Sequence, residues 1–293
     1  MQELIGTGVA LVTPFSAQGA VDHEALARVV HHQVENGIDY LVVLGTTGES
    51  VTLSIQEKQE VIQTIKEANN GRLPMVIGIG GNDTAVVVKE LKTSNLTDFI
   101  AVLSVSPSYS KPTQEGIYQH FKAVSQASSL PVILYNVPGR TGTNMAVETV
   151  VRLSAFENII AIKEAAGDLV QAMKMIQYTP EDFLVISGDD MIANAMVLAG
   201  GAGVISVIGQ AMAQDFSDMI CYALNGDVGE SYELHYKMAA VIEMIFEQGN
   251  PAGIKALLHH LELCGKEVRL PLVKADDLLS KRLKAFLECY KNQ

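Results

Sequence analysis

Short apolar segments recur along the chain, and most are followed by a stretch with the hydrophobic spacing of an amphipathic helix. Within these segments the apolar residues are continuous rather than alternating with polar ones, which is typical of strands buried on both faces of a parallel sheet. The expected strands are residues 9–12, 40–44, 75–79, 99–105, 132–135, 159–162, 183–187 and 204–208, with helical patterns between them, as at residues 24–35, 56–68, 84–92 and 116–125.

Eight strand–helix units in succession predict the α/β class and a (β/α)8 TIM barrel, a fold whose usual length is about 250 residues. An open, doubly wound sheet is the alternative. Such sheets commonly carry a Gly-x-Gly-x-x-Gly motif after the first strand, whereas residues 12–15 of this chain read Val-Thr-Pro-Phe. The barrel is therefore favoured.

The strand pattern stops after Gly226, and the remainder of the chain has helical spacing. Asn250 and Pro251 are typical of a helix N-cap followed by proline at the first helical position. We therefore expect a (β/α)8 catalytic domain over residues 1–225 and a C-terminal helical domain over residues 226–293, with three helices at residues 227–248, 251–263 and 275–291.

Charge and cysteine content limit the expected binding partners and the expected cellular compartment. The net charge of −12, from 21 basic and 33 acidic residues, argues against nucleic acid or an anionic membrane as partner. We expect no signal peptide and no membrane span, because no apolar run approaches the ~18–20 residues that a span needs. Cys221, Cys264 and Cys289 form no Cys-x-x-Cys pair. Such a sparse, odd set fits a reducing compartment, so a cytoplasmic protein is expected.

The most informative residue is Lys163, which lies in the apolar run Ile-Ile-Ala-Ile-Lys-Glu-Ala at residues 159–165. Burial disfavours the ammonium form of a lysine, and a neutral amine is a nucleophile. Such an amine forms a Schiff base with a ketone, and the Schiff base is an electron sink for carbon–carbon bond chemistry. The alternative is a lysine that ends its strand and pairs with a neighbouring carboxylate.

Other polar residues follow expected strands, and the C-terminal ends of the strands form the active site of a barrel. Residues 45–49 read Gly-Thr-Thr-Gly-Glu, in which backbone N–H groups and hydroxyls can converge on a carboxylate. An ordinary glycine-rich turn is the alternative. Tyr109 follows the fourth strand and Tyr135 ends the fifth, and a phenol can transfer protons. Arg140 can bind a carboxylate through two hydrogen bonds.

Metal and phosphate chemistry are disfavoured. All seven histidines fall in expected helices, and the pairs at residues 31–32 and 259–260 are adjacent, so their side chains point in different directions. The last strands carry no glycine-rich phosphate loop, since residues 200–203 precede the eighth strand. A magnesium site is a weak possibility, because carboxylates at strand ends are often helix caps. Its candidate ligands are Glu49, Asp83, Glu164, Asp189 and Asp190.

Three segments together resemble the signatures of the dihydrodipicolinate synthase (4-hydroxy-tetrahydrodipicolinate synthase) family of pyruvate-dependent class I aldolases. They are Gly-Thr-Thr-Gly-Glu at 45–49, Tyr-Asn-Val-Pro-Gly-Arg-Thr at 135–141 and Ile-Lys-Glu-Ala at 162–165. The similarity spans essentially the whole chain. A sibling such as N-acetylneuraminate lyase is the alternative. Thr46 and Arg140 favour the synthase, because sialate lyases usually carry Ser-Thr at the first pair and lack the arginine.

This resemblance implies a lyase that condenses pyruvate, as a Schiff base on Lys163, with L-aspartate 4-semialdehyde in the diaminopimelate and lysine biosynthesis pathway. No cofactor or metal is implied beyond the lysine adduct. Thr46 and Thr47 would hold the carboxylate of pyruvate, and Arg140 would hold the carboxylate of the semialdehyde.

The resemblance also implies a proton relay of Thr47, Tyr135 and Tyr109. Gly188 and Ile205 match positions that contact substrate through their backbone. The tyrosine that matches Tyr109 reaches into the neighbouring subunit's site, so a homotetramer built as a dimer of dimers is expected.

Feedback inhibition by lysine is expected to be weak or absent. Lysine-sensitive members of the family carry polar or aromatic groups, commonly histidine, glutamate and tyrosine, around the inhibitor. Ser50 and Asn82 match those members, but the positions that depart from them are Ile55, Lys58, Val86 and Ser108.

Overall fold

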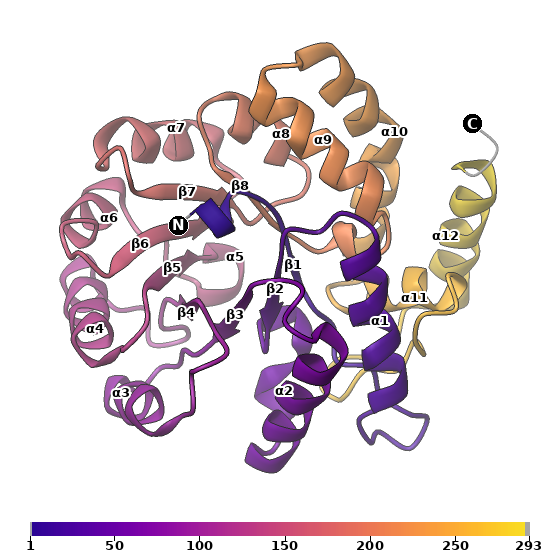
Figure 1. Ribbon diagram of the computed structural model, residues 1–293, viewed down its shortest axis with the longest axis horizontal. Helices are drawn as coiled ribbons and strands as arrows, with labels where there is room; N and C mark the ends of the chain where they lie inside the picture. Colours follow the sequence, from indigo (N-terminus) through magenta and orange to yellow (C-terminus); the bar gives the residue numbers. More distant parts are fainter. Residues whose placement is uncertain (1, 291–293) are drawn as a thin grey trace.

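Figure 1 shows the computed structural model of the protein, which describes residues 2–290. Eight parallel strands close into a barrel, each paired with its neighbours in sequence and the last paired with the first. Helices surround the barrel on the outside. The expected (β/α)8 barrel is therefore confirmed. The strands are β1 (Gly6–Ala10), β2 (Tyr40–Val43), β3 (Met75–Gly78), β4 (Ala101–Val105), β5 (Val132–Asn136), β6 (Ile159–Glu164), β7 (Leu184–Ser187) and β8 (Gly203–Ser206).

The strands are buried on both faces, as their continuous apolar sequences require. One set of side chains fills the barrel interior, including Tyr40 and Ile133, and the other set packs against the helices. Leu4, in the short 3₁₀ turn η1 (Gln2–Leu4), belongs to the interior set and covers the N-terminal end of the barrel. The opposite end is left for a functional site.

The first strand lies earlier than expected, at Gly6–Ala10 rather than residues 9–12. The glycines of β1 are not hydrophobic enough for the apolar pattern to include them in the strand. Close packing against a neighbouring side chain nevertheless requires a glycine in β1. A Cβ atom on Gly8 would lie 2.2 Å from the ring of Tyr40. The eighth strand, which pairs with the first, ends at Ser206, and the 3₁₀ turn η4 (Ile208–Gln210) follows it.

The outer helices begin behind capping side chains. Asp22, Ser54, Asp83 and Thr113 each accept a backbone N–H from the first turn of the helix that follows. The first four helices match the expected ones to within two residues at each end. The outer layer is α1 (His23–Glu35), α2 (Ile55–Asn69), α3 (Thr84–Thr93), α4 (Gln114–Ala127), α6 (Val147–Leu153), α7 (Leu169–Tyr178), α8 (Ala193–Leu198) and α9 (Ala213–Asn225).

The C-terminal segment is helical, as expected, and forms α10 (Val228–Glu247), α11 (Ala252–His260) and α12 (Asp277–Tyr290). α10 packs on α9, and α11 packs between α10 and α12 (orange to yellow in Figure 1). The division into domains at residues 225 and 226 stays a prediction. Residues 1 and 291–293, which the expected domains and the last expected helix include, lie outside the described residues.

The expected N-cap of α11 is wrong. Pro251 occupies the cap position, without a side-chain hydrogen bond to the helix. The Asn250 side chain instead donates to the hydroxyl of Thr47, 203 residues earlier in the chain. A tertiary partner has replaced the local one that the sequence suggested.

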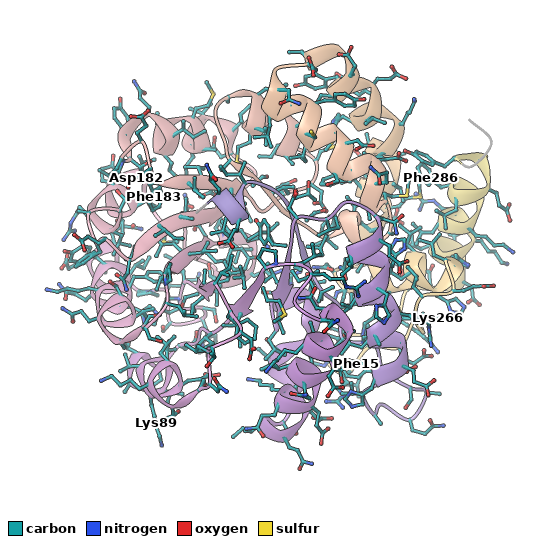
Figure 2. All side chains as sticks on the ribbon, viewed as in Figure 1. Phe15, Lys89, Asp182, Phe183, Lys266 and Phe286 are labelled. Atoms are coloured by element: carbon teal, nitrogen blue, oxygen red, sulfur yellow. The ribbon has the colours of Figure 1, made fainter. Side chains whose placement is uncertain are left out.

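Side chains fill the space between the barrel and its helices, as Figure 2 shows. Phe15, labelled there, is almost fully buried, and its ring receives the cations of Lys255 and Arg269 from the C-terminal segment. Within residues 2–290, no helix has both the length and the apolar character needed to cross a membrane.

Candidate active site

A cavity of about 610 Å³ opens at the C-terminal ends of the strands, between the barrel and the start of the C-terminal segment. Its walls come from strand ends, from the loop after β2 and from α10. The lining residues are Ala10, Gly45, Thr46, Thr47, Leu103, Tyr135, Val137, Gly139, Arg140, Lys163, Ala165, Gly188, Asp189, Met191, Val207, Ile242, Glu243, Phe246, Gly249 and Asn250.

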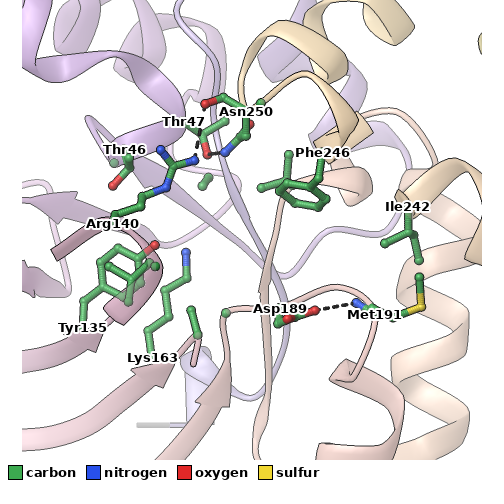
Figure 3. Close-up of a pocket in the computed structure, with 18 of the residues that line it drawn as sticks. Thr46, Thr47, Tyr135, Arg140, Lys163, Asp189, Met191, Ile242, Phe246 and Asn250 are labelled. Atoms are coloured by element: carbon green, nitrogen blue, oxygen red, sulfur yellow. Dashed lines mark hydrogen bonds between the residues drawn. The ribbon is translucent and has the colours of Figure 1, made fainter. Parts of the chain in front are cut away.

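Lys163 and Tyr135 lie side by side in this cavity (Figure 3), because they are paired across the neighbouring strands β5 and β6. The Lys163 Nζ atom is 4.5 Å from the centre of the Tyr135 ring. Both residues are buried, with 5% and 7% of their surface exposed. The amine and the phenol are thus held beside each other with little access to solvent.

Lys163 forms no ion pair within residues 2–290. The alternative of a strand-end lysine paired with a carboxylate is therefore not what the fold provides. Space for its side chain depends on Gly188, directly after β7, where a Cβ atom would lie 2.9 Å from Lys163 Cε. Only glycine leaves the lysine stem this path to the cavity.

Glu164, the neighbour of Lys163, points away from it into a separate network. Its carboxylate accepts hydrogen bonds from the Asn136 amide and from the backbone N–H of Ala166. Burial raises the pKa of Glu164, against the effect of these donors. Asn136 also accepts the N–H of Met145, so the network anchors the loop that carries Arg140.

Thr46 and Thr47 lie in the 3₁₀ turn η2 (Thr46–Gly48), directly after β2. Thr46 is exposed to the cavity, whereas Thr47 is buried and its Oγ1 accepts a hydrogen bond of 2.9 Å from Asn250 Nδ2. Glu49 follows in the left-handed region with φ of 52°. Its carboxylate accepts hydrogen bonds from Lys255 Nζ at 2.6 Å and from the backbone N–H of Arg269 at 2.9 Å.

Arg140 lies in the short helix α5 (Pro138–Thr141) and reaches across the cavity mouth. Its guanidinium donates to the backbone carbonyl of Asn250, at 3.4 Å. Arg140 and Thr47, two of the three residues expected to bind carboxylates, therefore contact the same residue of the C-terminal segment (Figure 3).

Two expected site residues lie elsewhere. Tyr109 is 92% exposed, has a left-handed φ of 64° and does not line the cavity of its own chain. The Ile205 side chain is buried inside the barrel, so its expected backbone contact with substrate stays a prediction, and Val207 lines the cavity. A smaller cavity of about 150 Å³ adjoins the first and is also lined by Thr46 and Tyr135.

The carboxylates named as possible magnesium ligands have other partners. Asp83 caps α3, Glu49 pairs with Lys255, and Asp189 accepts the N–H of Met191. Asp190 accepts the backbone N–H groups of Val207 and Ile208. Within residues 2–290 there is no group of three or more histidine, cysteine, aspartate or glutamate side chains placed to hold a metal ion.

Sequence reasoning missed Asn250, which lines the cavity, and Lys255, which pairs with Glu49 two residues after Thr47. Asn250 carried only a capping signal, although it reaches the cavity. Lys255 lies among the buried residues Ile254, Ala256 and Leu257, which is the same signal that singled out Lys163. A lysine within an apolar run indicates a buried lysine at both positions, but it does not indicate whether the lysine has a carboxylate partner.

The family model described as the dihydrodipicolinate synthetase family matches residues 3–289. A relative from Flavobacterium psychrophilum, named 4-hydroxy-tetrahydrodipicolinate synthase, is 62% identical over 287 residues, 98% of this chain and 98% of the relative. The solved dihydrodipicolinate synthase of Acinetobacter baumannii, complexed with pyruvate, is 37% identical with a TM-score of 0.95, covering 98% of this chain and 99% of that one. A monomeric dihydrodipicolinate synthase variant gives the same identity and TM-score, covering 99% and 97%.

Proposed function

This chain belongs to the dihydrodipicolinate synthetase family, and on that basis we propose that it is a lyase that condenses pyruvate with L-aspartate 4-semialdehyde. This is the activity of a 4-hydroxy-tetrahydrodipicolinate synthase, the name that its relatives carry. The product would feed diaminopimelate and lysine biosynthesis.

The observation that carries this proposal is the amine of Lys163, which is buried beside a phenol and has no ion-pair partner in the described residues. The nearest alternative, a lysine neutralised by a carboxylate, exists in this fold at Lys255. An amine without a counter-ion in a cavity is suited to nucleophilic attack on a ketone.

In the proposed reaction, Lys163 Nζ attacks the ketone carbon of pyruvate, and loss of water leaves an imine between the two atoms. Removal of a proton from the pyruvate methyl group gives an enamine, whose carbon then attacks the aldehyde carbon of the semialdehyde. Tyr135 is placed to carry protons in these steps, because its ring lies 4.5 Å from Nζ. No metal or cofactor is required, since the imine itself accepts the electron pair.

Carboxylate recognition is divided between two sides of the cavity. We assign the pyruvate carboxylate to the turn of Thr46 and Thr47, whose backbone N–H groups begin a 3₁₀ turn. Arg140 at the cavity mouth receives the carboxylate of the semialdehyde. Gly188 supplies backbone contact above Lys163.

The expected proton relay ran through Thr47, but the lining of the smaller cavity favours Thr46 for that step. Thr46 and Tyr135 both line the smaller cavity, whereas Thr47 is buried against Asn250. We therefore propose that Thr47 serves mainly the carboxylate and that Thr46 stands next to Tyr135 in the relay.

We further propose that Tyr109 completes this relay in a neighbouring subunit of a homotetramer. Its side chain is 92% exposed, and Val51, Ile55 and Val86 are further apolar side chains exposed to solvent. Val51 also lines the smaller cavity, which gives an approaching tyrosine a route toward Tyr135. The free cysteines Cys221 and Cys289 are exposed, which fits the proposed cytoplasmic location.

Reductive trapping tests the proposal. Borohydride with pyruvate is expected to inactivate the enzyme and to add the mass of a reduced pyruvate adduct to the peptide of Lys163. Lys255 is the matched control, because it is a second buried lysine and is expected to remain unlabelled. A label on another lysine, or none, contradicts the mechanism. Faster turnover with N-acetylmannosamine than with the semialdehyde would assign the chain to the sialate lyase siblings instead.

A further inference from the structure

We propose that Asn250, between α10 and α11, is a positioning residue that orients the Thr47 hydroxyl toward the carboxylate of pyruvate. The inference rests on the proposed function and adds to it a role for the C-terminal segment. Asn250 lines the cavity, yet it belongs to a part of the chain outside the eight strand–helix units.

The direction of one hydrogen bond carries the argument. A threonine hydroxyl has one proton to donate and two lone pairs to accept. Asn250 Nδ2 donates to Thr47 Oγ1 at 2.9 Å, so the amide occupies a lone pair and leaves the threonine proton unused. Within residues 2–290, Thr47 Oγ1 donates to no acceptor. Its proton is therefore free for an anion that enters the cavity.

The other hydrogen-bonding groups of Asn250 are only partly satisfied by the protein. Its Oδ1 atom is buried and has no partner in the described residues, which is a costly arrangement for a residue with a purely structural role. Its backbone carbonyl accepts from the guanidinium of Arg140. Asn250 thus contacts the side chains proposed for both substrate carboxylates.

The turn after β2 and the C-terminal segment are joined at a second point. This second contact holds Asn250 in a fixed position relative to Thr47. Lys255 Nζ and Glu49 Oε1 are 2.6 Å apart, and their side chains are 0% and 1% exposed. The turn that holds Thr47 is therefore attached to the C-terminal segment at Thr47 itself and at Glu49, the residue that follows the turn. Asn250 acts from a rigid support rather than from a loose loop.

Steady-state kinetics of Asn250→Ala test the proposal. Loss of the amide donor should raise KM for pyruvate by about tenfold, the effect of one buried hydrogen bond. KM for the semialdehyde should change little, and borohydride should still trap pyruvate on Lys163 at saturating concentration, which shows that the variant has folded. Asn250→Asp should be worse, because a carboxylate accepts the Thr47 proton and repels pyruvate.

Asn95→Asp is the matched control for the added charge. Asn95 is exposed, and its Oδ1 acts only as an acceptor toward Thr97. An aspartate preserves both of those hydrogen bonds, so pyruvate kinetics should be unchanged.

A double-mutant cycle with Thr47→Val separates positioning from a general structural effect. If Asn250 acts through the hydroxyl, Asn250→Ala should add nothing to the KM of the Thr47→Val enzyme. The assignment would be overturned if the increases in KM for pyruvate caused by Asn250→Ala and Thr47→Val multiplied in the double variant. A normal KM for pyruvate in Asn250→Asp would also overturn it. In that case the wild-type enzyme still forms its pyruvate adduct. Absence of that adduct in the wild-type enzyme would overturn the proposed function as well.

Discussion

Two buried lysines in this protein differ in their partners. Lys255 is fully buried and lies 2.6 Å from the carboxylate of Glu49. Burial lowers the pKa of Lys255, whereas the Glu49 carboxylate opposes that effect. The charge of the Lys255 ammonium is therefore balanced by the carboxylate beside it. Lys163 lies beside the face of Tyr135 and forms no ion pair within residues 2–290. The first lysine is suited to hold a structure together, and the second is suited to chemistry.

Arg140 provides a prediction for substrate recognition. Replacing it with alanine should raise KM for the semialdehyde and lower kcat/KM by about 10- to 100-fold, since hydrogen bonds between charged groups are individually strong. Arg140→Lys keeps the charge but not the two-pronged geometry, and should recover only part of the loss. Steady-state kinetics with both variants check this. Equal turnover of an uncharged aldehyde would contradict the role.

Asp190 provides a prediction for pH dependence. Burial raises the pKa of its carboxyl from its usual 3.8 to about 6. The folded protein therefore binds this proton more tightly than the unfolded chain does, so this group's contribution to stability falls as pH rises from about 4 to about 6. Relative to Asp190→Asn, the wild-type protein should lose about 2 kcal/mol over that range. Urea unfolding of both proteins across the range measures the difference, and parallel curves would contradict it.

At this scale the sequence predicted some of the site and missed the rest for a physical reason. Lys163, Thr46, Thr47, Tyr135 and Arg140 all line one cavity, because each follows or ends a strand of a barrel. The residues that the pattern missed come from the C-terminal segment, whose position relative to the strands depends on tertiary packing.

Among the elements, the turn after β2 and the start of α11 are joined by the buried pair of Glu49 and Lys255. Lys255→Met should destabilise the protein by about 3–5 kcal/mol, because it leaves the Glu49 carboxylate buried and unpaired. The double variant with Glu49→Gln should recover part of this loss. Urea unfolding followed by circular dichroism gives both values.

Lys237→Met is the matched control for this experiment. Lys237 also pairs with a glutamate, Glu233, at 2.7 Å, but on an exposed face of α10. Its loss should change stability very little, since solvent screens exposed pairs. Similar losses for both lysine variants would show that burial of the Glu49 pair is unimportant.

Strands and helices were predicted well where their own side chains determine them. The helices of the first four units follow from apolar spacing and caps, and they lie within two residues of the expected bounds. β1 is displaced because the packing of Tyr40 over Gly8 is a contact between strands. The cap at Asn250 failed for a similar reason, because a residue far away in sequence competes for its side chain.

For the molecule as a whole, Tyr109 predicts complementation between subunits. Tyr109→Phe and Lys163→Ala should each be nearly inactive alone. If Tyr109 serves a neighbour's site, mixed dimers hold one site with both groups, and about a quarter of wild-type activity should return after random reassembly. Activity assays before and after mixing measure this. Full activity of Tyr109→Phe, or no recovery on mixing, would contradict a shared site.

Inhibition by lysine is the second prediction at this scale. Ile55 and Val86 are exposed apolar residues, and Lys58 lines the smaller cavity together with Ser50. The Lys58 ammonium should repel the ammonium of a bound lysine by about 1 kcal/mol, so inhibition should be weak or absent. Lys58→Glu should strengthen it. Half-inhibition of the wild-type enzyme by sub-millimolar lysine in a coupled assay would contradict the prediction.

The attachment of the turn at Thr47 to Asn250 has a consequence for the order in which the enzyme is made. Protein synthesis releases Thr47 203 positions before Asn250, and Glu49 206 positions before Lys255. A nascent chain halted before residue 250 already contains Lys163 and Tyr135, yet Thr47 lacks its donor and Glu49 lacks its cation. The full affinity for pyruvate therefore arrives only after residues 250 and 255 have been made, and ribosome-bound intermediates should bind pyruvate more weakly than the released enzyme.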